Sequence, residues 1–198
     1  MAIIVDKTQK RREIAASCKE LFVNNSMKDL TISTIAKTAN VGKGTIYDYF
    51  ENKEDIIIEL VTILKQEYNL AKDARVAKQS STKEKIKLFF DFFYSKEGAE
   101  LREIYKNFIA ISLTSPNQKM MDFHTKCSGD YYLMAEALVD EGIKNGEITP
   151  LATKLTKGLF AFTEGLFISS IATNGERDLE QEINEYIDAI FSLIEVKK

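Results

Sequence analysis

Residues 30 to 53 read Leu30-Thr-Ile-Ser-Thr-Ile-Ala-Lys-Thr-Ala-Asn-Val-Gly-Lys-Gly-Thr-Ile-Tyr-Asp-Tyr-Phe-Glu-Asn-Lys53. Asn tolerates the left-handed conformation that ends many helices, so Asn40 is expected to close a first short helix. Gly42 is expected to cap a second one. Two short helices around a tight turn form a helix-turn-helix, whose second helix enters the DNA major groove. The first helix is predicted by four apolar residues at three- and four-residue spacing: Ile32, Ile35, Ala36 and Ala39.

The same pattern also fits a helical hairpin buried in some other all-α protein. The identity of the residues favours DNA binding over such a hairpin. Residues 35–55 resemble the DNA-binding signature of the TetR family of bacterial transcriptional regulators, and they read Ile35-Ala-Lys-Thr-Ala-Asn-Val-Gly-Lys-Gly-Thr-Ile-Tyr-Asp-Tyr-Phe-Glu-Asn-Lys-Glu-Asp55. Asn40 stands where that family usually has Gly, and Gly42 stands where it often has Ser. Both residues suit the same backbone roles.

The candidate DNA-binding residues lie in and beside the second helix. Gly44 has no side chain, so the backbone there can approach DNA closely, while hydroxyl groups can donate hydrogen bonds to phosphates or base edges. The resemblance implies that Lys43, Thr45, Tyr47 and Lys53 occupy positions that commonly touch DNA in that family. Tyr49 and Phe50 are expected in the core. The full set of predicted DNA-binding residues is Thr31, Ser33, Lys43, Gly44, Thr45, Tyr47 and Lys53.

The composition predicts an all-α protein. The chain has 198 residues, of which 44% are hydrophobic, and only two prolines. No segment shows sustained strand alternation. We expect about nine helices, arranged as an N-terminal helix-turn-helix domain over residues 1–53 and a helical ligand-binding and dimerisation domain over residues 54–198. Outside the helix-turn-helix, the expected helices cover residues 6–24, 52–78, 81–95, 99–113, 117–144, 150–173 and 177–196.

The charge is distributed unevenly along the chain. The net charge is −3, but residues 1–53 carry +3 and the remainder carries −6. A basic N-terminal segment on an acidic body suits a protein that contacts phosphate with that segment alone. Four cations lie at the start of the first expected helix: Lys7, Lys10, Arg11 and Arg12. Cations at a helix start oppose the helix dipole, so this group either contacts phosphate or is a solvated helix start.

Aromatic and polarisable side chains are concentrated between residues 81 and 173. Each alone is more often a core residue than a pocket residue, but TetR-like proteins hold an inducer among the corresponding helices. The resemblance therefore implies a hydrophobic or aromatic effector, oriented by His124 and Tyr131. The predicted ligand-binding residues are Phe89, Phe93, Tyr105, Phe108, Met120, Phe123, His124, Cys127, Tyr131 and Phe160.

Small residues line one face of the helix expected over residues 150–173. Interior glycines cost on the order of 1 kcal/mol relative to alanine, so two of them indicate that another backbone comes close. With the last helix, this face could form half of a four-helix bundle across a two-fold axis, which is where TetR-like proteins dimerise. The alternative is that both helices only close the monomer core. The predicted dimer residues are Gly158, Ala161, Phe162, Gly165, Ser169, Ile183, Ile187 and Ile190.

Other functional classes have little support in the sequence. His124 and Cys127 lie three residues apart, but no further His or Cys completes a metal shell, so neither a metal nor a cofactor is expected. No nucleophile has a matching His, and no glycine-rich phosphate loop occurs. Cys18 and Cys127 are expected as reduced residues of a cytoplasmic protein, and no run reaches transmembrane length.

The sequence therefore predicts a ligand-responsive transcriptional repressor. It would bind a palindromic operator in double-stranded DNA as a homodimer, away from membranes, and a small hydrophobic effector would release it. Two alternatives stay open: a TetR-like DNA-binding protein controlled by a protein partner, and a helical enzyme or scaffold.

Overall fold

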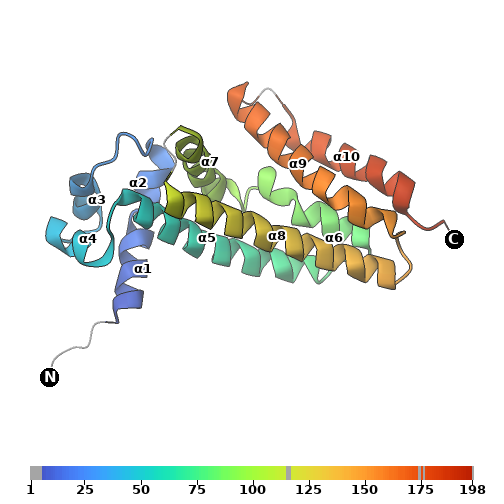
Figure 1. Ribbon diagram of the computed structural model, residues 1–198, viewed down its shortest axis with the longest axis horizontal. Coiled ribbons are helices and arrows are strands. Elements are labelled where there is room, and N and C mark those ends of the chain that lie inside the picture. The colour runs from blue at the N-terminus through green and yellow to red at the C-terminus, as the bar shows by residue number, and fades with distance from the viewer. Residues whose placement is uncertain (1–5, 115–116, 174, 176, 198) are drawn as a thin grey trace. The chain divides into compact units, whose positions relative to one another are not determined.

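The computed structural model describes residues 6–114, 117–173, 175 and 177–197, and within them it contains ten α-helices, one 3-10 turn and no strand (Figure 1). The all-α prediction is confirmed. The elements are α1 (Lys7–Ser17), α2 (Lys19–Asn24), α3 (Ile32–Thr38), α4 (Lys43–Tyr49), α5 (Lys53–Val76), α6 (Thr82–Phe89), η1 (Asp91–Phe93), α7 (Ala99–Thr114), α8 (Gln118–Lys144), α9 (Leu151–Ala172) and α10 (Leu179–Ile194).

The chain packs as two compact units. Unit 1 contains residues 1–67 and 100–123, and unit 2 contains residues 68–99 and 124–198. Helices α5 and α8 each contribute residues to both units. Unit 1 thus holds more of the chain than the 53 N-terminal residues that carry the helix-turn-helix pattern, and the predicted domain boundary stays a prediction.

The first predicted helix, over residues 6–24, is wrong as a single element, because the chain breaks at Cys18 between α1 and α2. Cys18 leaves helical geometry at φ −94° and ψ 5°. Its N–H donates to the Ala15 carbonyl oxygen at 3.1 Å, a contact across three residues that tightens the last turn of α1. The Cys18 side chain is fully buried, with its sulfur 3.8 Å from the Ile35 carbonyl oxygen. This burial raises the pKa of the thiol.

The helix-turn-helix forms as its caps predict. Thr31 accepts the Thr34 N–H at 3.1 Å and so begins α3. Asn40 ends that helix with φ 52°, which is the left-handed conformation expected of it. Gly42 then takes extended geometry as the N-cap of α4. Asn52 caps α5 in the same way as Thr31, since its side-chain oxygen accepts the Asp55 N–H at 2.9 Å.

In unit 2, the helix predicted over residues 81–95 is also wrong as a single element. Ser81 caps α6 by accepting the Glu84 N–H at 3.3 Å, but α6 ends at Phe89 and a 3-10 turn follows. The turn places Asp91 inside the unit, where its two carboxylate oxygens accept hydrogen bonds from α5. The apolar periodicity of residues 81–95 did not predict this break in the helix, which coincides with the burial and hydrogen bonding of the Asp91 carboxylate.

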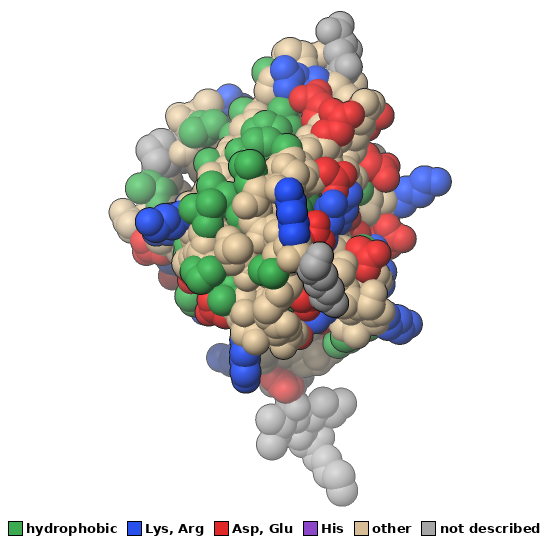
Figure 2. Space-filling model, turned by 90° about the vertical axis from the view of Figure 1, so that its right-hand side faces the viewer, with side chains coloured by type: hydrophobic (Ala, Val, Ile, Leu, Met, Phe, Trp, Pro, Cys, Tyr) green, Lys and Arg blue, Asp and Glu red, His purple; other side chains and the backbone are tan. Residues whose placement is uncertain are grey.

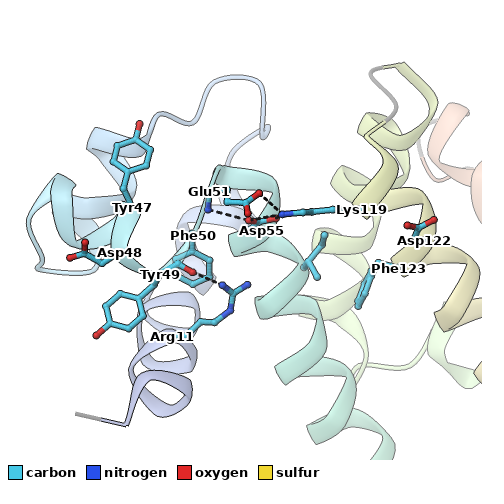
Figure 3. A pocket seen from close by; sticks show the side chains of 11 residues that line it. Arg11, Tyr47, Asp48, Tyr49, Phe50, Glu51, Asp55, Lys119, Asp122 and Phe123 are labelled. Carbon is cyan, nitrogen blue, oxygen red and sulfur yellow. Dashed lines mark hydrogen bonds and ion pairs between the residues drawn. The ribbon is translucent and has the colours of Figure 1, made fainter. Parts of the chain in front are cut away.

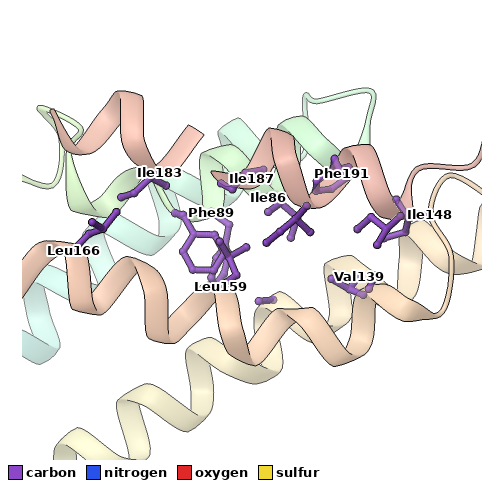
Figure 4. Packing of buried hydrophobic residues seen from close by; sticks show 14 residues of the cluster. Ile86, Phe89, Val139, Ile148, Leu159, Leu166, Ile183, Ile187 and Phe191 are labelled. Carbon is purple, nitrogen blue, oxygen red and sulfur yellow. The ribbon is translucent and has the colours of Figure 1, made fainter. Parts of the chain in front are cut away.

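The core of unit 2 joins α6, α8, α9 and α10 (Figure 4). Its buried residues are Ile86, Phe89, Phe90, Ala135, Val139, Ile148, Ala152, Leu159, Leu166, Ile183, Ile187, Ile190, Phe191 and Ile194. Backbone hydrogen bonds close the cluster at one end, because Thr149 donates to the Ile194 carbonyl at 2.8 Å and Val196 donates to the Glu147 carbonyl at 2.9 Å.

Candidate nucleic-acid interface

Helix α4 has one buried face and one exposed face. Ile46 and the residue that follows the helix, Phe50, are buried in unit 1. Lys43 and Gly44 are exposed, and the Tyr47 side chain is 55% exposed despite its size. Thr45 is half-buried. The core thus fixes the inner face and presents three of the predicted DNA-binding residues to solvent.

The flanking candidates differ in how available they are. Ser33 and Thr31 are exposed, although the Thr31 hydroxyl already caps α3 and lies 2.9 Å from the Thr34 hydroxyl. Lys53 is half-buried, and its ammonium donates to the carbonyl oxygens of Met27 at 2.6 Å and Leu30 at 3.0 Å. Lys53 therefore holds the loop before α3, and any DNA contact by it stays a prediction.

Arg11 also has an internal role that its place in the basic N-terminal group did not indicate. Its guanidinium donates to the Tyr49 carbonyl oxygen and pairs with Glu59 at 2.8 Å. The same group lies 4.3 Å from the centre of the Phe50 ring, in a cation–π contact. A cation at the carboxyl end of α4 is favourable to the helix dipole. Arg11 therefore anchors α4 to α1 and α5, and a phosphate contact by it stays a prediction.

A second anchor reaches the α4–α5 junction from the first turn of α8. The Lys119 ammonium lies 2.5 Å from a Glu51 carboxylate oxygen and 3.4 and 3.5 Å from the two oxygens of Asp55 (Figure 3). Asp55 is buried and also accepts the Glu51 N–H at 3.1 Å. No sequence pattern indicates this contact, because the two segments are separated by more than sixty residues.

A groove of about 590 Å³ lies beside these contacts within unit 1. Figure 3 shows Lys119 directed at Glu51 and Asp55, while the Tyr47 ring points away from them. The exposed face of α4 therefore lies apart from the ion pairs that fix the end of the helix. The lining residues are Arg11, Tyr47, Asp48, Tyr49, Phe50, Glu51, Asp55, Ile58, Lys119, Asp122 and Phe123.

The predicted ligand-binding residues divide between the two units. Tyr105, Phe108, Met120 and Phe123 belong to unit 1. Phe108 and Met120 are buried there, and the rings of Phe108 and Phe123 meet edge to face at 5.6 Å. These four residues therefore include part of the unit 1 core.

The other six belong to unit 2: Phe89, Phe93, His124, Cys127, Tyr131 and Phe160. Phe89 contacts Tyr131 at 6.1 Å and Phe160 at 6.0 Å between ring centres, and Phe93 contacts Phe167 at 5.5 Å. Tyr131 is half-buried and donates to the Asn69 side chain at 2.8 Å. Burial raises the pKa of its phenol. We call Phe89, Tyr131 and Phe160 the aromatic cluster.

Sequence patterns missed the buried polar groups of α5 that face this part of unit 2. Tyr68 donates to one Asp91 oxygen at 2.5 Å, and Arg75 donates to the other at 2.7 Å. Burial and the Asp91 carboxylate together raise the pKa of the Tyr68 phenol. Lys72 is 1% exposed. The periodicity of α5 could have indicated them, because all three residues fall on one helical face with the apolar stripe.

The predicted dimer residues fall into two groups. Gly158, Ala161 and Gly165 are exposed on α9, and no atom would lie within 4 Å of a Cβ added to either glycine. Ser169 is half-buried, and Phe162 stacks on Tyr186 at 3.8 Å between ring centres.

The remaining three predicted dimer residues, Ile183, Ile187 and Ile190, belong to the buried core of unit 2. Their assignment to a surface is corrected, because their side chains already pack within the chain. Exposed apolar residues that the stripe did not include are Leu151, Ile168, Ile171, Leu193 and Val196. The view in Figure 2 shows hydrophobic side chains gathered on one side and acidic side chains on the other.

Neither a membrane-spanning helix nor a metal-binding cluster occurs in the described part of the chain. None of the helices described there is long and apolar enough to cross a membrane. Within the same residues, no group of three or more His, Cys, Asp and Glu side chains could hold a metal ion.

Comparison with known proteins relates this architecture to regulators. The family model described as bacterial regulatory proteins, tetR family, matches residues 14–60. The fatty acid metabolism regulator protein of Bacillus subtilis is 25% identical over 196 residues, which cover 96% of this chain and 98% of that protein.

Solved structures agree with the fold. A TetR-family transcriptional regulator from Cytophaga hutchinsonii superposes with a TM-score of 0.76 at 21% identity, covering 99% of this chain and 100% of that one. The regulator FadR from Bacillus subtilis, in complex with stearoyl-CoA, has a TM-score of 0.62 at 24% identity, with 89% and 95% covered. At these identities the structures show a shared fold alone. Residues 14–60, which contain the helix-turn-helix, thus match the N-terminal segment of bacterial regulatory proteins of the tetR family, and the chain shares its all-α fold with solved regulators of that family.

Proposed function

We propose that this protein is a homodimeric repressor that binds a palindromic operator and is released by a small apolar effector. The observation that carries the DNA-binding part is the exposed face of α4, where Lys43, Gly44 and Tyr47 reach solvent while Ile46 and Phe50 are buried. Arg11 and Lys119 hold the end of that helix and its junction with α5. A rigidly supported helix loses little conformational freedom when it enters a groove.

The experiment begins with selection of bound DNA from a random pool, followed by gel shifts on the selected site at several salt concentrations. Lys43→Ala is expected to weaken binding and to lower the slope of log affinity against log salt by about one, because one phosphate contact is lost. Tyr47→Ala is expected to abolish binding to the site.

Lys78→Ala is the matched control, since it removes one exposed cation from the turn after α5, away from α4 in the sequence. Its affinity and salt slope should equal those of the unmodified protein. Wild-type affinity in Tyr47→Ala, or equal salt slopes in both lysine variants, would contradict the assignment of α4 as the reading helix.

The dimer part of the proposal depends on α9 and α10. Two subunits are needed because a helix-turn-helix dimer reads half-sites about 34 Å apart. Gly158 and Gly165 leave an open strip on α9, and Ile168 and Ile171 extend it with exposed apolar surface. We assign this strip, together with Leu193 of α10, to the contact between subunits.

The effector part is supported by the aromatic cluster of unit 2 and by the relative that was solved with stearoyl-CoA. An effector releases DNA only if it binds the non-binding conformation more tightly than the binding one. Addition of an effector to the gel shift should therefore lower DNA affinity, and addition of operator DNA should lower effector affinity by the same factor.

A further inference from the structure

The first turn of α8 holds the segment that joins α4 to α5. The Lys119 ammonium lies 2.5 Å from a Glu51 carboxylate oxygen and 3.4 and 3.5 Å from the two oxygens of Asp55. Glu51 directly follows Phe50, the C-cap of α4, and Asp55 lies in the first turn of α5. One cation of α8 therefore contacts both ends of the short connection that follows the candidate DNA-reading helix.

The two carboxylates are partners of different kinds for Lys119. The Glu51 side chain is 75% exposed, and an ion pair at such a position is weak on its own because water screens it. The Asp55 side chain is only 10% exposed, and it is oriented by the Glu51 N–H, which donates to it at 3.1 Å. A shielded carboxylate is screened less by salt than an exposed one. Asp55 therefore gives Lys119 an anchor of fixed position.

Open space adjoins this contact. Lys119, Glu51 and Asp55 all line the groove of about 590 Å³ in unit 1. Figure 3 shows the Lys119 side chain extended toward the two carboxylates. The ammonium can therefore separate from its partners without displacing packed side chains, so that the contact can be either made or broken.

The remainder of α8 belongs to unit 2. Ala135 and Val139 are buried in the core of that unit, and Tyr131 is a member of the aromatic cluster, where the proposed effector would bind. The helix runs without a break over 27 residues, which is roughly 40 Å at 1.5 Å per residue. A continuous helix is a rigid element, so a shift of its unit 2 part is carried to Lys119.

We propose that α8 couples unit 2 to the DNA-reading helix, and that the contact of Lys119 with Glu51 and Asp55 is the connection. An effector that shifts α8 would break this contact and release the end of α4, which lowers DNA affinity. Helix α5 also contributes residues to both units and is the competing route. This inference rests on the proposed function, since it names the path by which the effector acts on DNA binding.

The test uses the selected operator DNA as its probe. Coupling between sites is reciprocal, so DNA bound at α4 must act on α8 as α8 acts on DNA binding. Hydrogen exchange of residues 124–144, the unit 2 part of α8, is measured by mass spectrometry with and without saturating DNA. In the unmodified protein, DNA is expected to slow this exchange about five-fold or more, from the usual range of coupling factors. This comparison needs no variant, so it decides the matter even if a variant fails to fold.

Lys119→Met is expected to abolish the slowing, because Met keeps the apolar stem of Lys and removes its charge. Each variant is compared at a DNA concentration that saturates it, so a lower affinity does not by itself remove the effect. Lys119→Arg should retain the slowing, since it keeps the cation. Lys126→Met is the matched control, because Lys126 is an exposed cation further along the same helix. Its exchange should respond to DNA like that of the unmodified protein.

Exchange of residues 124–144 that DNA leaves unchanged in the unmodified protein would overturn the inference. So would undiminished slowing in a folded Lys119→Met. Slowing confined to residues 68–76, the unit 2 part of α5, would assign the coupling to that helix instead. In each of these cases the proposed function stands, because specific DNA binding has been observed. If selection finds no preferred DNA sequence, the proposed function fails and the inference fails with it.

Discussion

At the scale of single residues, two cations of the N-terminal segment, Lys53 and Arg11, make contacts that stabilise the chain itself. Lys53 bridges two carbonyl groups of the loop before α3, and Arg11 holds the last carbonyl of α4. A count of positive charge in the sequence does not separate these residues from exposed cations such as Lys43. The separation is physical, because a carbonyl group without a partner loses hydration that only a nearby donor replaces.

Lys53→Met is therefore expected to lower the free energy of unfolding by about 1–3 kcal/mol, because it leaves two half-buried carbonyl oxygens without their donor. Urea unfolding followed by circular dichroism measures the change. Lys37→Met is the control, as Lys37 is an exposed cation in the last turn of α3. If the two variants are equally stable, the internal role of Lys53 is wrong.

At the scale of elements, two glycines of the long helix α8 differ in the space around them, although both lie within the helix. Gly142 of α8 faces Thr82 at the start of α6, and a Cβ added to it would lie 2.7 Å from the Thr82 Cγ2 atom and closer still to its hydroxyl. Gly129 of the same helix has no atom within 4 Å of an added Cβ. Gly142 therefore lies where α8 approaches the start of α6 closely, whereas Gly129 faces open space.

Gly142→Ala is expected to destabilise the protein by about 1–3 kcal/mol, the usual cost of overpacking a close contact. Gly129→Ala is expected to stabilise it by about 0.5–1 kcal/mol, because alanine is the better helix former. Thermal or urea unfolding of both variants decides the matter.

The double variant Gly142→Ala, Thr82→Ala provides a further check on this contact. It should recover part of the loss, since the two side chains then no longer overlap and their effects do not add. A loss of equal size in Gly129→Ala and Gly142→Ala would show that helix packing at Gly142 does not matter.

At the scale of the whole molecule, the exposed apolar strip of α9 and α10 has the character of a contact with a second copy. Leu193 of α10 is 72% exposed, and Ile168 and Ile171 of α9 are more than 40% exposed. Exposed apolar residues on both helices favour association, because burying them removes apolar surface from water.

Ile168→Glu is expected to convert the proposed dimer to a monomer, since each two-fold interface would bury two unpaired carboxylates. Sedimentation at micromolar concentration measures the mass. Leu70→Glu, at an exposed position of α5, should leave the mass unchanged. A monomeric unmodified protein, or a dimer that survives Ile168→Glu, would contradict the assignment.

The sequence by itself determined the all-α class, the helix-turn-helix and its caps, because these depend on local spacing and on the backbone preferences of residues such as Thr31, Asn40 and Gly42. From Gly158 and Gly165 it predicted a close approach of another backbone; no atom of the chain lies within 4 Å of a Cβ added to either glycine, and the contact stays a prediction. Only the tertiary structure decided which side chains are already occupied within the chain. Ile183, Ile187 and Ile190 proved to be core, and Lys53 and Arg11 proved to be internal donors. Arg75 of α5 and Asp91 of η1 meet in unit 2 from separate elements. Such contacts depend on packing between distant segments, which periodicity along one helix does not encode.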